Sequence, residues 1–283
     1  MEKLKKKVAI ITGGSRGIGK AITKVFLLEG ARVIIAARSK SKIKETIENL
    51  RHKGEIIGIV TDVSDENQVK RLINKTMESF GNIDILINAA GVQAPIGSLV
   101  DINIQEWIEN IRINLIGTML CCKTVLPIMI KKRKGKIINF SGGGATSPRP
   151  FFSAYAVSKV GVVKLTEILA QEVKEYGIDV NAIAPGAVDT RMLDEIIQAK
   201  EKAGSKEERE AIMRKQKEAT PPEVAGELVV FLASEESNGL TGKLISAVWD
   251  DWKDDNFRNM MMTNYDWGTL KRIDEKNFGR LNG

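Results

Sequence analysis

Histidine is almost missing from this chain, and cysteine is scarce. His52 is the only histidine among 283 residues, which excludes catalytic triads built on histidine and histidine-rich metal sites. We therefore expect no metal site. The two cysteines, Cys121 and Cys122, are adjacent within an apolar segment. Because neighbouring residues rarely make an unstrained disulfide, we expect two buried thiols rather than a redox site.

Long apolar runs are also missing. The longest, such as 8–11 and 33–37, have the length of a strand, whereas a membrane span needs about 20 apolar residues. The basic segment 1–7 leads into a five-residue strand-like run and not into the longer apolar core of a signal peptide. These absences predict a cytoplasmic protein without a membrane partner.

Acidic residues are outnumbered by basic ones. The chain has 43 Lys and Arg against 36 Asp and Glu, a formal net charge of +7 at pH 7. Much of the excess is spread over helical segments interleaved with glutamate, which is not the arrangement of an element that reads nucleic-acid bases. We therefore expect no nucleic-acid partner, and the charge favours an anionic cofactor or substrate.

Strand-like and helical patterns alternate along most of the chain. This alternation predicts an α/β fold with a parallel sheet covered by helices on both faces, in a single domain over 1–250. The expected strands lie at 7–12, 31–37, 55–61, 83–88, 136–141, 179–184 and 243–248. The expected helices lie at 17–29, 41–52, 66–80, 104–131, 153–176 and 220–233.

Two regions depart from the alternation. Residues 194–219 are polar and charge-rich, which suits either a mobile helical flap or a solvated insertion. The C-terminal extension, 251–283, is polar and has no convincing period. Four aromatic residues from position 249 onward are expected to cover a substrate pocket, to form an oligomer interface or to act as ordinary packing anchors: Trp249, Trp252, Tyr265 and Trp267.

A glycine-rich loop joins the first predicted strand to the first predicted helix. Glycine lets the backbone turn sharply and approach a pyrophosphate, and the helix N-terminus supplies amide donors. The spacing is Gly-x-x-x-Gly-x-Gly rather than the commoner Gly-x-Gly-x-x-Gly. The loop predicts dinucleotide binding by Gly13, Ser15, Arg16, Gly17, Ile18 and Gly19.

The end of the second predicted strand indicates which dinucleotide the protein binds. An acidic residue here would bind the ribose hydroxyls of NAD, but this chain has Arg38 instead. Arg16 lies in the glycine-rich loop, so two guanidinium groups would meet a 2′-phosphate. NADP(H) is therefore preferred, with NAD(H) as the alternative. The competing interpretation is that both arginines are solvated surface residues.

Two further strand ends carry residues suited to a ligand. Asp62 and Val63 follow the third strand, where a carboxylate would accept from the adenine amino group. Asn88, Ala89 and Gly91 follow the fourth strand, where small residues let a ligand lie on the backbone. Ligands of open α/β sheets bind at the carboxyl ends of the strands.

Tyr155 and Lys159 are four positions apart in a predicted helix, so they project from one face. A phenol ionises near pH ~10, and a neighbouring ammonium favours the phenolate and lowers that pKa. The pair predicts a proton donor and acceptor suited to carbonyl–alcohol chemistry. Because this spacing is common on helix surfaces, the other motifs must decide whether the pair is catalytic.

Together these motifs resemble the short-chain dehydrogenase/reductase family, over about residues 5–248 and in family order. The resemblance implies a Rossmann-type doubly wound sheet of about seven parallel strands, in a homotetramer or homodimer. Tyr155 would be the general acid or base, and Lys159 would lower its pKa and bind the nicotinamide ribose. Asn114 would hold a water in the proton relay. Residues lining the nicotinamide would be Pro185, Gly186, Val188 and Thr190.

The sequence departs from the family pattern at the catalytic serine. That residue usually lies thirteen positions before the tyrosine, and here the position is Gly142. Ser141 precedes it and would reach the substrate carbonyl if the loop shifts. The alternatives are that a backbone amide or Thr146 polarises the carbonyl. The glycine pair that commonly follows the last strand is also replaced, here by 246–252.

We therefore predict an NADP(H)-dependent oxidoreductase that transfers a hydride between nicotinamide and a small carbonyl or alcohol substrate. The alternative is a nucleotide-binding regulatory or scaffold protein that has lost efficient catalysis. Gly142 at the serine position motivates that alternative, and Tyr155, Lys159 and Asn114 count against it.

Overall fold

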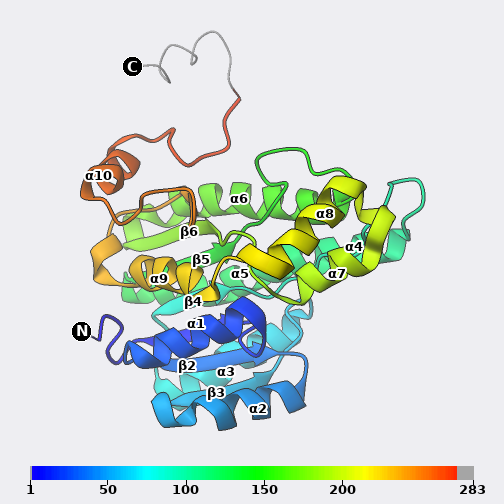
Figure 1. Ribbon diagram of the computed structural model, residues 1–283. Coiled ribbons are helices and arrows are strands. Elements are labelled where there is room, and N and C mark those ends of the chain that lie inside the picture. Colours follow the sequence, from blue (N-terminus) through cyan, green and yellow to red (C-terminus); the bar gives the residue numbers. More distant parts are fainter. Residues whose placement is uncertain (1, 273–283) are drawn as a thin grey trace.

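A seven-stranded sheet forms the centre of the computed structural model, which describes residues 2–272 (Figure 1). The strand order is β3-β2-β1-β4-β5-β6-β7 and every pairing is parallel. The predicted Rossmann-type sheet is thereby confirmed. The strands are β1 (Val8–Thr12), β2 (Arg32–Ala37), β3 (Ile56–Val60), β4 (Ile85–Asn88), β5 (Gly135–Phe140), β6 (Ile178–Ala184) and β7 (Leu244–Ser246).

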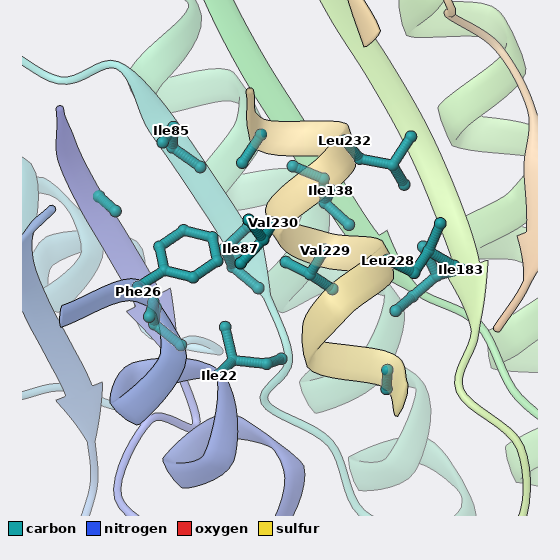
Figure 2. Close-up of a cluster of buried hydrophobic side chains, with 14 of the residues drawn as sticks. Ile22, Phe26, Ile85, Ile87, Ile138, Ile183, Leu228, Val229, Val230 and Leu232 are labelled. Carbon is teal, nitrogen blue, oxygen red and sulfur yellow. The ribbon is translucent and has the colours of Figure 1, made fainter. Parts of the chain in front are cut away.

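Helices cover both faces of the sheet. Side chains alternate between the two faces along each strand, and both faces are apolar, so each must be buried. Ile11 and Ile35 point to one face, and Ile10 and Ile34 to the other. The first face carries α1 (Gly17–Leu28), α2 (Lys40–Leu50) and α9 (Pro222–Ala233). The second carries α3 (Glu66–Phe80), α5 (Gly117–Lys132) and α6 (Ser153–Val173). Figure 2 shows α9 laid against β4, β5 and β6, with α1 beside it.

The long helix predicted over 104–131 is interrupted. It consists of α4 (Ile104–Ile111), a π-helical turn at Arg112–Ile116, and α5. The whole stretch is long and apolar enough to cross a membrane, yet 56% of its most apolar window is buried inside the protein. It includes Cys121 and Cys122, and the expectation that both thiols are buried is confirmed.

The polar region after β6 is helical. It contains α7 (Arg191–Ala199), α8 (Ser205–Met213) and a π-helical turn at Arg214–Glu218. Some of its residues are nevertheless buried, among them Leu193, Ile196 and Ala211. This α7–α8 segment (residues 191–213) therefore packs on the rest of the fold.

The last part of the chain contains a helix that the sequence did not predict. It is α10 (Asp255–Thr263), capped by the Asp254 side chain, which accepts from the Phe257 N–H. Trp252 stacks on Phe231 of α9 with ring centroids 5.6 Å apart, so it is a packing anchor. Trp249, by contrast, is 85% exposed. Residues 273–283 of the predicted extension lie outside the described residues.

The segment 250–270 lies along the outer edge of β7. The Leu244 N–H donates to the Gly268 carbonyl at 2.7 Å, and the Ser246 N–H donates to Asp250 Oδ2 at 2.7 Å. Lys243 Nζ donates to carbonyls of the same segment, at Asn264, Tyr265 and Trp267. Backbone donors on the free side of this edge strand are therefore occupied by the chain itself.

Candidate active site

A cavity of about 360 Å³ opens at the carboxyl ends of the strands. This edge of a doubly wound sheet is where ligands bind. Most of the residues singled out from the sequence lie on its wall: Gly13, Ser15, Arg16, Gly17, Ile18, Gly19, Arg38, Asp62, Val63, Ala89, Gly91, Ser141, Tyr155, Lys159, Pro185 and Thr190. Motifs spread over almost 180 positions of sequence thus meet in one cavity.

The glycine-rich loop is shaped by close backbone contacts. Gly13 has φ of +69°, and a β-carbon there would lie 3.0 Å from the Ala89 carbonyl oxygen and the Ala90 backbone. A β-carbon at Gly17 would lie 3.3 Å from Thr190 Cγ2. The loop therefore packs against the segments that follow β4 and β6, where side chains have little room.

Helix α1 presents an open N-terminus to this cavity. Its N-cap, Arg16, makes no side-chain cap, and the first turn contains no acidic residue. The first amides of a helix carry partial positive charge and lack intrahelical partners. The loop and helix start therefore fit a diphosphate, as the sequence predicts.

Arg38 and Arg16 both line the cavity and are exposed. Neither forms an ion pair with a carboxylate within residues 2–272. Asp62 lies on the same wall, and its Oδ1 accepts from the N–H and the hydroxyl of Ser64 at 2.9 and 2.7 Å. Two cations and one oriented carboxylate therefore surround this end of the cavity.

Some predicted cofactor residues do not line the cavity. Asn88 is buried in the sheet, where its Nδ2 donates to Asn139 Oδ1 at 2.9 Å. Val188 is also buried and pairs with Thr220 in an isolated β-bridge. Gly186 has φ of +82° and packs near Val248. These residues shape the backbone around the cavity rather than its wall.

Tyr155 and Lys159 lie at the inner end of the cavity, both almost fully buried at 7% and 4% exposure. Lys159 Nζ is 5.5 Å from the centroid of the Tyr155 ring and donates to the Phe140 carbonyl at 2.8 Å. Burial lowers the pKa of Lys159 to about 8. A lysine on a helix is therefore fixed to the end of β5.

The pKa of Tyr155 moves against the sequence-based expectation. Burial raises it, and the cation that opposes the rise is Arg149 rather than Lys159. The expected lowering by the neighbouring lysine is thus wrong for this structure. The physical reason is that removing a phenolate from water raises the pKa by more than the charge of Arg149 lowers it.

Ser141 lies on the cavity wall, and Gly142 packs against Tyr155. Ser141 lines the cavity, and its hydroxyl is buried and has no hydrogen-bond partner within residues 2–272. A β-carbon added at Gly142 would overlap the Tyr155 hydroxyl oxygen and lie 3.0 Å from Cζ. A serine at position 142 therefore has no room beside Tyr155. Thr146 is exposed and does not line the cavity.

Asn114 does not line the cavity but organises its wall. It lies in the π-helical turn, where it is fully buried. Its Oδ1 accepts from the Val92 N–H at 2.9 Å, and its Nδ2 is 2.9 Å from the Val92 carbonyl and 3.0 Å from Ser158 Oγ. The side chain thereby ties the segment after β4 to α6. Its part in a water relay stays a prediction.

Sequence reasoning missed several residues of the wall. Most of them lie near the predicted motifs along the chain, and their position at strand ends was the available signal: Ala36, Ala37, Ser39, Thr61, Val92, Ile113, Phe140, Arg191 and Met192. Arg149 and Glu207 near Tyr155 were also missed, since 58 positions separate them.

Comparison with known proteins gives a consistent family. The model of the short chain dehydrogenase family matches residues 7–201. An oxidoreductase of Bacillus subtilis is 36% identical over 254 residues, which cover 87% of this chain and 91% of the relative. A 3-oxoacyl-(acyl-carrier-protein) reductase of Thermotoga maritima is 36% identical over 245 residues, which cover 86% of this chain and 96% of the relative.

Solved structures share the fold as well. Levodione reductase matches with a TM-score of 0.79 and 29% identity, covering 86% of this chain and 96% of that protein. A variant of the actinorhodin polyketide ketoreductase, solved with NADPH, matches with a TM-score of 0.80 and 28% identity, covering 85% and 95%.

Proposed function

The chain belongs to the short-chain dehydrogenase/reductase family, and from that premise we propose an NADP(H)-dependent enzyme that interconverts a carbonyl compound and its alcohol. One observation carries the proposal: a single cavity joins the glycine-rich loop at the start of α1 to Tyr155 and Lys159 on α6. A diphosphate at the loop and a reacting carbon at Tyr155 would occupy the two ends of that cavity.

The nicotinamide cofactor supplies the hydride, and the chain supplies binding, orientation and proton transfer. Tyr155 holds its proton at neutral pH, since the ordinary pKa of a phenol is already ~10 and burial raises the pKa of Tyr155 further. It is therefore suited to donate that proton to the oxygen of a carbonyl substrate. Lys159 donates one N–H to the Phe140 carbonyl. Its two other N–H groups fit ribose hydroxyls.

Ser141 is proposed to hold the substrate oxygen. Its buried hydroxyl lacks a partner among the described residues, and buried polar groups without partners are rare unless a ligand completes them. Ser141→Ala should lower kcat by roughly 10²–10³-fold, the effect of removing one such donor. Thr146→Ala is the matched control, since Thr146 is exposed. A fully active Ser141→Ala enzyme removes Ser141 from the mechanism.

The proposed catalytic role of Tyr155 is tested by following NADPH absorbance over a panel of carbonyl substrates. Tyr155→Phe removes the only transferable proton of this side chain, so activity should fall by roughly 10²–10⁴-fold, whereas NADPH affinity should be preserved. Cofactor binding without turnover, unchanged by the substitution, would instead indicate a nucleotide-binding regulatory protein.

NADP(H) preference is proposed from Arg16 and Arg38, which line the cavity without carboxylate partners in the described part of the chain. The NADPH-bound ketoreductase among the similar structures is consistent with it. Fluorescence titration should show tighter binding of NADPH than NADH. Arg38→Ala should weaken NADPH binding by about tenfold or more and leave NADH binding unchanged; equal weakening of both overturns the preference.

We further propose one catalytic domain over 1–250, with 194–219 as its flap and 251–283 as an extension, in a cytoplasmic homo-oligomer. The oligomer is supported by exposed apolar side chains on two adjacent helical stretches. These side chains are Ile104, Ile108, Ile116, Val157, Val160 and Ile168.

A further inference from the structure

Arg149 and Glu207 form a bidentate ion pair above Tyr155. Arg149 lies in the loop between β5 and α6, and Glu207 lies on α8. Arg149 Nε donates to Glu207 Oε1 at 3.0 Å, and Nη2 donates to Oε2 at 2.9 Å. The side chains are only 14% and 26% exposed. A guanidinium that is this well desolvated needs a carboxylate in fork geometry.

The guanidinium group is also positioned by its neighbours. It stacks 3.8 Å from the centroid of the Phe152 ring and lies 5.9 Å from that of Tyr155. Gln93 Oε1 is 3.5 Å from Nη1, and Gln93 Nε2 donates to the Met192 carbonyl at 3.1 Å. Segments following β4, β5 and β6 thus meet at one cation beside the proposed proton donor.

The α7–α8 segment closes the site on this side. Leu193, Ile196, Ala203 and Ala211 form one buried cluster with Tyr155. A substrate at Tyr155 can reach the Arg149 guanidinium only if this segment moves, because Glu207 on α8 occupies that group. Because Glu207 is carried by the same segment, that movement takes away the carboxylate that Arg149 binds.

We propose that Arg149 is the binding site for a carboxylate of the substrate, which replaces Glu207 when the α7–α8 segment moves. The substrate is then an oxo acid or the corresponding hydroxy acid. The inference rests on the proposed function and specifies its substrate class. The geometry favours a carboxylate because the group that now occupies the site is one, held through both oxygens.

A simple latch between the loop and α8 makes different predictions. If the pair only holds the segment down, Arg149→Gln and Glu207→Gln loosen the same contact and change activity in the same direction for every substrate. If Arg149 binds the substrate, Arg149→Gln removes the site, whereas Glu207→Gln removes its competitor. The two variants then shift the preference for acids in opposite directions.

The test compares short oxo acids with their methyl esters: acetoacetate and 4-oxopentanoate, each against its ester, by NADPH oxidation. For the acid relative to the ester, Arg149→Gln should lower kcat/KM by roughly ten- to hundredfold, the range for a hydrogen-bonded charge, mainly through KM. Glu207→Gln should raise it. Lys215→Gln, which breaks the ion pairs with Asp189 and Asp194 away from Arg149, should leave the ratio unchanged.

Binding is measured separately from turnover, so that the two proposals can fail independently. Isothermal titration of 4-oxopentanoate into the enzyme–NADP⁺ complex should show binding that is lost in Arg149→Gln and tightened in Glu207→Gln. If this binding pattern is seen but no substrate is turned over, the proposed function is overturned and the carboxylate site is supported. Equal acid-to-ester ratios in all variants, or shifts of the same sign in both, overturn the carboxylate site.

Discussion

The hydroxyl group of Tyr155 occupies space that only a glycine at position 142 leaves free. Tyr155 is packed on its other side by the cluster that includes Leu193 and Ile196, so it has little freedom to retreat. Gly142→Ala would place a methyl group on the hydroxyl oxygen. We expect it to displace the phenol, to cost about 1–3 kcal/mol of stability, and to lower kcat at least ~10-fold.

Gly143→Ala is the matched control for Gly142→Ala. Its methyl group would meet nothing closer than 3.5 Å, so it removes a glycine from the same loop without touching Tyr155. Steady-state rates with a neutral ketone and thermal melts of both variants measure the effect. Equal activity of the two variants would show that the phenol can shift and that Gly142 has no steric role.

Lys159 makes the stability of the fold depend on pH. Its folded pKa is about 8, below the ordinary value of 10.5, because burial disfavours the ammonium. Below pH 8 the folded state therefore carries an unfavourable buried charge. Between about pH 8 and 10.5 the unfolded chain binds more protons, so stability rises with pH.

Urea unfolding of the protein and of Lys159→Met, an uncharged side chain of similar length, measures this effect. The difference in unfolding free energy, unaltered protein minus variant, should increase by up to ~3 kcal/mol from pH 7 to pH 10.5. Other titrating groups cancel in the difference. A difference that stays constant or falls with pH contradicts the assigned direction of the pKa shift.

For single residues, some features of the site could be predicted from the sequence and others could not. The glycines that shape the loop, such as Gly13 and Gly17, were predicted because their spacing in the sequence is typical of such a turn. The overlap of Gly142 with Tyr155 was not found, since it depends on where a loop places one phenol. The direction of the Tyr155 pKa shift was missed for a related reason: burial cannot be read from a four-residue spacing.

At the scale of elements, local signals located most helices and strands. Helix α3 begins and ends where predicted, because Asp65 caps its start and Gly81, with φ of +68°, ends it. Helix α10 was missed although Asp254 caps it, since its apolar side chains meet α9 only through the tertiary fold. The π-helical turn around Asn114 has no sequence signature of its own.

The contact of Lys243 with the segment 264–268 predicts a local change in hydrogen exchange. Lys243 Nζ donates to three carbonyls there, at 2.7 to 3.1 Å. Lys243→Met should release this segment, so that Gly268 no longer covers the Leu244 N–H. Exchange of the Leu244 amide should then accelerate at least ~10-fold, the loss of about one net hydrogen bond.

Asp250→Ala, which removes the acceptor of the Ser246 N–H, gives the reciprocal control for the Lys243 prediction. Asp250 covers the Ser246 N–H and not that of Leu244. Each variant should therefore expose one amide of β7 and leave the other protected. Acceleration of both amides by either variant would mean that the edge strand opens as a unit, and that Lys243 has no separate role.

At the scale of the whole molecule, an edge of the sheet and a helical surface are compared as sites where copies of the chain meet. One is the edge of β7, where the N–H groups of Leu244 and Ser246 are already bonded to the chain's own segment 250–268. An edge strand whose donors are occupied cannot extend the sheet. The other surface is the pair of apolar stripes on α4 and α6, which nothing in residues 2–272 covers.

Association is therefore expected through the helices. Ile108→Glu combined with Val160→Glu places two charges on stripes that are 44% and 36% exposed at these residues, and burying unpaired charges opposes assembly. Size-exclusion chromatography with light scattering should show an oligomer for the unaltered protein and a smaller species for the double variant. Leu28→Glu, a similarly exposed change on α1 in the opposite layer, should leave the oligomer intact. An unaltered protein that is monomeric at micromolar concentration, or a double variant of unchanged mass, contradicts assembly through α4 and α6.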